Sequence, residues 1–164
     1  MTILAVGALA LGGCYDFGAP IDVAPRLALD PALLGTWRCL PSDPAPDATP
    51  ANFVVARARD LVYSIALQEK DEDPDRYEAH ASGVGGRTVL NVRDLDPKAQ
   101  AKPWSFARYT FLVPDVLRVE LVSDEALKGV EHSPGSLRAA LERPEARPEL
   151  YVDFCVCVRA RRPQ

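Results

Sequence analysis

The sequence predicts an all-β protein: an eight-stranded antiparallel up-and-down barrel with one short helix before the last strand. Three observations predict this fold. Apolar and polar residues alternate with a period of two along most of the chain. Turn residues interrupt this alternation at short intervals, as in a meander of hairpins. A meander leaves two exposed edges unless its first and last strands pair, so we expect the sheet to close.

The first strand follows a single helical turn, which Asp30 can cap and Pro31 can begin. A proline-rich segment at 41–46 ends this strand, because proline cannot donate ladder hydrogen bonds. The third strand alternates most clearly, with Leu61, Tyr63, Ile65 and Leu67 on one face. All eight strands are expected at residues 36–40, 52–58, 61–68, 77–84, 87–93, 104–113, 116–123 and 150–159.

The second half of the barrel is marked by two tight hairpins. Gly85 and Gly86 suit the positive φ values of a two-residue turn between the fourth and fifth strands. Pro114 and Asp115 form the second turn, between the sixth and seventh strands. A short helix with a narrow apolar stripe is predicted after Ser133, and we expect it to cover one end of the barrel.

The interior of such a barrel is either filled by side chains or wide enough for one small ligand. Trp37, Tyr63 and Tyr109 are the candidate ligand-binding residues, because a buried aromatic ring with a polar atom can orient a bound molecule. An empty interior of roughly 300 Å³ or more would favour binding, and a packed one would favour docking. The predicted inward residues are bulky: Tyr63, Ile65, Leu67, Leu90, Val92, Tyr109, Phe111, Leu117, Val119, Leu121, Phe154 and Val156.

The N-terminus has the anatomy of an export signal. The apolar run at 3–11 is too short to span a bilayer and has the length of a signal-peptide core. It leads into Leu11-Gly12-Gly13-Cys14, which resembles a bacterial lipobox. That resemblance implies a signal peptide at 1–13 and a lipid anchor on Cys14, hence a cell-envelope protein. Tyr15, where aspartate would signal inner-membrane retention, implies the outer membrane in a cell that has one.

Residues 14–29 contain prolines and little periodicity, so we expect a lipidated flexible tether ahead of a barrel domain at 30–164. The Gly35-Thr36-Trp37 sequence on the first strand resembles the lipocalin-like, or calycin, group. In that group the glycine lets the chain enter the barrel and the tryptophan plugs one end. The resemblance makes Arg159 the arginine that covers the tryptophan. The order of segments is similar to that of small bacterial lipoproteins of unknown function, which implies a fold and an anchor but no activity.

Three cysteines remain if Cys14 is acylated, and an exported chain favours one disulfide among them. Cys155 and Cys157 are two apart on one strand, a poor geometry for a mutual bond. We therefore expect Cys39 to pair with Cys155 or Cys157 across the barrel seam, and three free thiols are the alternative. Alternation places Cys39 inward but the other two outward, and a β-bulge near Arg38 would reconcile them.

Composition and motifs exclude several functions. A formal charge of -4 argues against nucleic acid as a partner. No nucleophile elbow or phosphate loop is present, so we expect no enzyme and no cofactor. A metal site using Cys155, Cys157 and either His80 or His132 lacks regular ligand spacing, so we expect no metal.

The sequence thus favours a membrane-anchored lipoprotein whose barrel binds a small apolar ligand. The alternative is a structural or assembly lipoprotein whose filled barrel docks a membrane protein partner.

Overall fold

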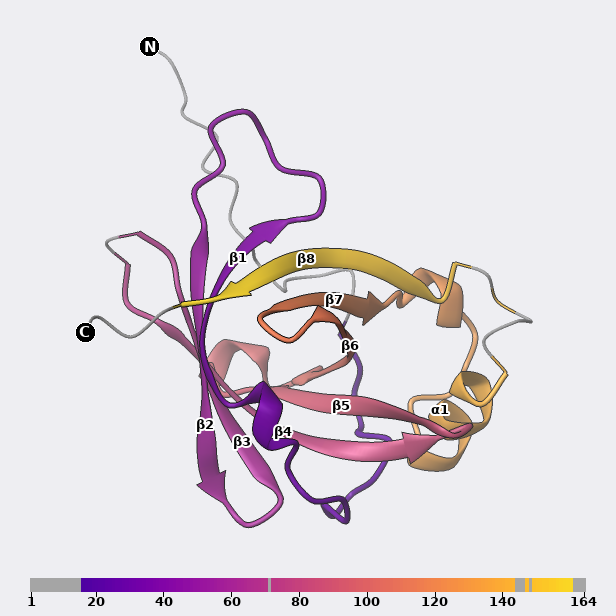
Figure 1. The fold of residues 1–164 in the computed structure, drawn as a ribbon. Coiled ribbons are helices and arrows are strands. Elements are labelled where there is room, and N and C mark those ends of the chain that lie inside the picture. The colour runs from indigo at the N-terminus through magenta and orange to yellow at the C-terminus, as the bar shows by residue number, and fades with distance from the viewer. Residues whose placement is uncertain (1–15, 71, 144–146, 148, 161–164) are drawn as a thin grey trace.

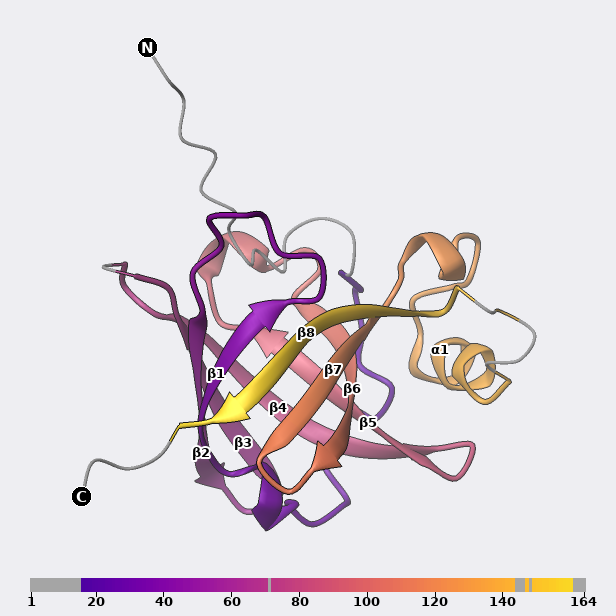
Figure 2. The same ribbon diagram turned by 45° about the horizontal axis from the view of Figure 1, so that its top comes forward.

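The computed structural model describes residues 16–70, 72–143, 147 and 149–160, and these form a closed antiparallel barrel with strand order β1 to β8 (Figure 1). β8 pairs with both β1 and β7 and so closes the sheet (Figure 2). The predicted fold is confirmed, including the short helix α1, Pro134–Leu141, before the last strand. The strands are β1 Gly35–Pro41, β2 Ala51–Arg59, β3 Val62–Gln68, β4 Asp75–Val84, β5 Arg87–Asp94, β6 Trp104–Val113, β7 Val116–Val122 and β8 Tyr151–Arg159.

The turns follow the local sequence closely. Gly85 and Gly86 have φ of 55° and 75° and form the β4–β5 hairpin, as predicted. Short 3₁₀ turns lie at Pro31–Leu33, Pro97–Ala99 and Glu125–Leu127. Leu61 was expected at the start of the third strand, but it lies in the preceding turn with φ of 62°. The β2–β3 register shifts between Arg57 and Arg59 beside that turn.

A β-bulge in β8 decides which of its side chains enter the barrel. Val119 pairs with Cys155 and Glu120 pairs with Asp153, so Phe154 is the extra residue. The β1–β8 pairing is continuous on both sides of Arg38, so the prediction of a bulge near Arg38 is wrong. The bulge lies instead on the partner strand.

The consequence is that β8 changes faces at Phe154. Cys155 and Cys157 are buried inside, whereas Val156 and Val158 are exposed outside by 38% and 51%. The predicted inward position of Val156 is therefore wrong. One extra residue moves every later side chain to the opposite face.

The barrel carries two apolar cores, one inside and one on its outer surface. The inner core surrounds Trp37 and includes side chains from all eight strands. The outer core joins Leu137 and Leu141 of α1 to the outward-facing Val84, Val89 and other residues. The expectation that α1 covers a barrel end is therefore wrong, because its apolar stripe packs on the outer wall beside the β4–β5 hairpin (Figures 1 and 2).

The segment 16–22 packs against that same outer wall. Phe17 and Ile21 are buried, and Phe17 forms an isolated β-bridge with Trp104. The Asn91 side chain accepts a hydrogen bond from the Ile21 backbone N–H at 2.7 Å and donates to the Ser82 hydroxyl at 2.8 Å.

The flexible tether expected over 14–29 is thus wrong for these residues. Its Phe17 and Ile21 complete an apolar surface, and its backbone satisfies polar groups on β5. Cys14 and the predicted signal peptide lie outside the described residues. Within the described residues, no helix has the length and apolar character needed to cross a bilayer.

Candidate functional site

One end of the barrel is closed around Trp37, which is 1% exposed. Its indole N–H donates to the Leu33 carbonyl at 2.9 Å, and the Arg159 guanidinium lies 4.1 Å from the ring centroid. Arg159 also donates to the Leu34 carbonyl at 2.9 Å. Gly35 is needed here, because its φ is 137° and a Cβ would lie 2.8 Å from the Arg159 Nη1. These contacts confirm that Trp37 plugs the barrel and that Arg159 covers it.

The two candidate tyrosines, Tyr63 and Tyr109, are also held at this closed end by hydrogen bonds with Asp30. The Tyr109 hydroxyl donates to the Asp30 carboxylate at 2.8 Å, and the Tyr63 oxygen accepts from the Asp30 backbone N–H at 2.6 Å. Burial raises the pKa of both phenols, and the Asp30 carboxylate adds to this effect. Both hydroxyls therefore stay protonated at neutral pH. The Tyr109 O–H is therefore engaged with the Asp30 carboxylate, and the Tyr63 oxygen already accepts one hydrogen bond from the Asp30 backbone.

The interior holds a cavity of about 90 Å³. Trp37 and Tyr109 border it, and Tyr63 does not. Most of its wall is aliphatic or aromatic, from residues such as Phe53, Ile65 and Leu117. This volume is well below the roughly 300 Å³ at which ligand pockets begin. The barrel is therefore largely filled by its own side chains.

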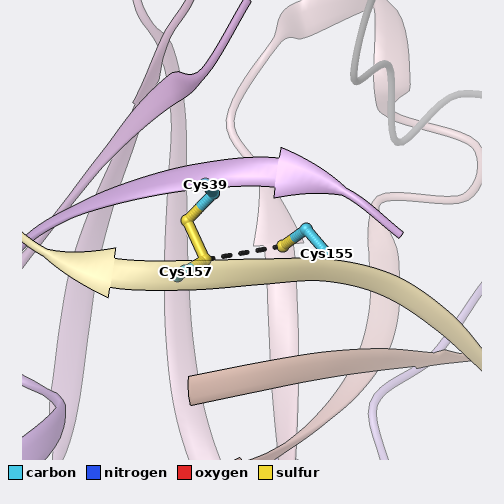
Figure 3. Close-up of side chains that lie close together, drawn as sticks. All are labelled: Cys39, Cys155 and Cys157. Carbon is cyan, nitrogen blue, oxygen red and sulfur yellow. Dashed lines mark hydrogen bonds between the residues drawn. A yellow bond between two sulfur atoms is a disulfide. The ribbon is translucent and has the colours of Figure 1, made fainter. Parts of the chain in front are cut away.

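Three cysteines meet inside the barrel at the junction of β1 and β8 (Figure 3). Cys39 and Cys157 are directly opposed, with Cα atoms 4.0 Å apart, and form a disulfide with a sequence separation of 118. This seam disulfide is one of the two predicted pairings. Among the cysteines that the structure describes, Cys155 is a buried free thiol, with its Sγ 3.6 Å from that of Cys157. Burial raises the pKa of Cys155 to about 12, so it is a neutral thiol rather than a nucleophile.

The outer wall around the seam carries exposed apolar side chains. We define the seam face as Leu40, Val54, Val113, Val156 and Val158, which are 38% to 55% exposed. Register places Leu40 opposite Val156 and Arg38 opposite Val158.

Two arginines accompany this face. Arg38 is exposed, and Arg118 pairs with Val156 across the β7–β8 ladder. The Arg118 Nε is buried and has no hydrogen-bond partner among the described residues. The same Nε lies 3.8 Å from the Asp153 carboxylate and 4.0 Å from that of Glu120, so the charge of Arg118 is compensated within the barrel. Among the described residues, the seam face is therefore an exposed apolar strip beside the exposed Arg38.

The two histidines hold the N-terminal segment and lie apart from the cysteines. His80 Nε2 is 2.8 Å from the Asp22 carbonyl oxygen, and His132 Nδ1 accepts from the Gly18 backbone N–H at 3.1 Å. Both are thus engaged on the outer wall. A mixed histidine–cysteine site is not assembled by these residues.

The comparisons with known proteins add no identity: no family model, curated protein or solved structure matches this chain.

Sequence reasoning missed the seam face, because alternation alone assigned Val156 to the interior. It also missed Asn91, which anchors the N-terminal segment. A buried asparagine in the middle of a predicted strand could have signalled a packed segment above it, because its amide needs partners.

Proposed function

We propose that this protein is an envelope lipoprotein that acts by docking a protein partner rather than by carrying a ligand. The filled interior is the observation behind this choice. A cavity of about 90 Å³ is too small for an ordinary ligand, and the two candidate tyrosine hydroxyls are bonded to Asp30. The outer surface is then the part of the barrel able to recognise another molecule.

The proposed anchor on Cys14 would hold the barrel close to the membrane. Only Tyr15 and Asp16 separate Cys14 from Phe17, and Phe17 is fixed to the barrel wall by its bridge to Trp104. Three residue steps span at most about 11 Å. A lipid on Cys14 would therefore keep the β5–β6 side of the barrel near the bilayer surface.

The β1–β8 seam is displaced around the barrel from that bridge, because β8 is two strands and β1 three strands away from β6 in the closed order. A lipid on Cys14 would therefore leave the exposed apolar residues of β1 and β8 accessible to a partner. Its exposed valines beside Arg38 fit a partner segment that combines apolar side chains with an acidic residue.

A photo-crosslinking amino acid at Val156, introduced into the full chain in its own host, tests the docking proposal. We expect one discrete adduct, whose crosslinked partner peptide contains apolar residues and an aspartate or glutamate. Arg38→Glu should weaken this adduct by charge repulsion. The matched control is the same crosslinker at Val23, which is 79% exposed but belongs to the N-terminal segment. Equal adducts at both positions, or insensitivity to Arg38→Glu, would refute docking through the seam face.

A small apolar ligand is the second candidate function, and the apolar wall of the cavity favours it. Size limits this ligand strictly. An engineered protein cavity of about 150 Å³ accommodates benzene, so a cavity of about 90 Å³ suits only a smaller molecule. Native mass spectrometry of protein purified from its host separates the two functions. A retained apolar ligand at one per chain would replace the docking proposal with ligand binding.

A further inference from the structure

The three inward cysteines form a cluster that the docking function does not use. All three Sγ atoms lie within 4.8 Å of one another, and all three residues are buried (Figure 3). Two β8 residues supply neighbouring sulfurs, and Cys39 supplies the third from β1. All three cysteines also border the interior cavity.

We propose that these cysteines, when the seam disulfide is reduced, form a three-thiolate binding site for a trivalent thiophilic metalloid of the arsenite class. The spacing supports this. A centre with three bonds of about 2.3 Å to sulfur sets the sulfurs about 3.5 to 4 Å apart. The Cys155 and Cys157 sulfurs are already 3.6 Å apart. The rigid β1–β8 ladder holds Cys39 directly opposite Cys157, so little movement is required.

Charge selects the metalloid over common metal ions. Zn²⁺ with three thiolates carries a net charge of minus one, and a structural zinc site needs a fourth ligand that this cluster does not supply. Cu⁺ with three thiolates carries a net charge of minus two, which is costly in an apolar interior. Trivalent arsenic with three thiolates is neutral.

The binding chemistry is balanced in two steps. A dithiol reductant first reduces the Cys39–Cys157 bond to two thiols and itself becomes a disulfide. Arsenous acid then condenses with the three thiols. Three As–O bonds break, three As–S bonds form, and each thiol proton leaves with a hydroxide as water. The arsenic stays trivalent throughout. Arsenous acid is small and uncharged, so an apolar barrel does not repel it as it would an ion.

The test uses the full chain, reduced with a phosphine because a dithiol would compete for arsenic. Native mass spectrometry should show one adduct per chain, equal in mass to one arsenic minus three hydrogens. Thermal unfolding of the reduced protein should shift upward with arsenite, because binding stabilises the folded state. Cys155→Ser retains the other two cysteines and should lose both the adduct and the shift. Val156→Ser, on the outer face of the same strand, should keep both.

Several outcomes would overturn this site. One is an arsenic adduct that survives in Cys155→Ser, and another is binding of Cu⁺ but not arsenite by the reduced protein. A reduced protein that unfolds before binding would also overturn it, because the cluster exists only in the closed barrel. The oxidised protein should show no adduct, because its disulfide occupies two of the three sulfurs. None of these measurements depends on the lipid anchor or on docking.

Discussion

Replacement of Trp37 by alanine tests the closed end of the barrel. The side chain is 1% exposed, packs against Phe111 at a centroid distance of 6.1 Å, and borders the interior cavity. A buried tryptophan removes about 200 Å² from water, which corresponds to an upper bound of about 5 kcal/mol. Large-to-alanine substitutions in cores cost about 3 to 5 kcal/mol. We expect the upper half of that range, because the hydrogen bond to Leu33 and the contact with Arg159 are also lost.

Urea unfolding of the oxidised protein measures this free energy, and Trp104 remains as the fluorescent reporter because the chain contains two tryptophans. The control is Val158→Ala, a truncation at a side chain that is 51% exposed, which should change the free energy of unfolding by less than about 0.5 kcal/mol. A loss below about 1 kcal/mol in Trp37→Ala would show that the indole does not plug the barrel.

Four further predictions follow from the sequence and the packing. Cys14→Ser should release the protein from membranes and remove acyl mass; a variant that still pellets after a high-salt wash would refute the anchor. Non-reducing peptide mapping should recover the seam disulfide, with Cys155 alkylated only after unfolding; rapid alkylation of the native protein would contradict its burial. Hydrogen bonds from Arg108 hold the pKa of Glu120 below the usual glutamate value. This pair therefore stabilises the fold above a pH of about 4.5, and it loses that contribution as the pH falls through the folded-state pKa of Glu120. Urea unfolding at pH values from about 3 to about 7 tests this contribution. The free energy of unfolding should fall less towards acid in Glu120→Gln than in the parent. Asn91→Ala should speed hydrogen exchange at the Ile21 amide, because it removes that amide's acceptor, and unchanged exchange would show that packing alone holds the segment.

Much of the fold followed from local patterns. Alternation and turn chemistry located all eight strands, because each depends on residues adjacent in sequence. The Gly35-Thr36-Trp37 motif predicted the closed end. Its geometry needs one positive φ and one large ring, and both are local properties.

The wrong prediction in β8 arose because the face on which a side chain lies also depends on how its strand pairs with the neighbouring strand. Val156 and Val158 alternate cleanly, and valine suits either face of a sheet, so alternation could not show that a bulge precedes them. The parity conflict between Cys39 and the β8 cysteines did reveal that a bulge existed. It could not say which strand contained it, because a bulge in either strand restores the pairing.

The sequence by itself determined the number and order of the strands and the barrel closure, and it favoured a cross-seam disulfide over three free thiols. Only the tertiary structure decided that Cys157 pairs with Cys39, that the segment at 16–22 packs on the outer wall, and that the interior is nearly filled. The physical reason is the sequence separation over which each kind of interaction acts. Backbone preferences act between neighbours, whereas packing volume and register are settled by side chains far apart in sequence that share one closed interior.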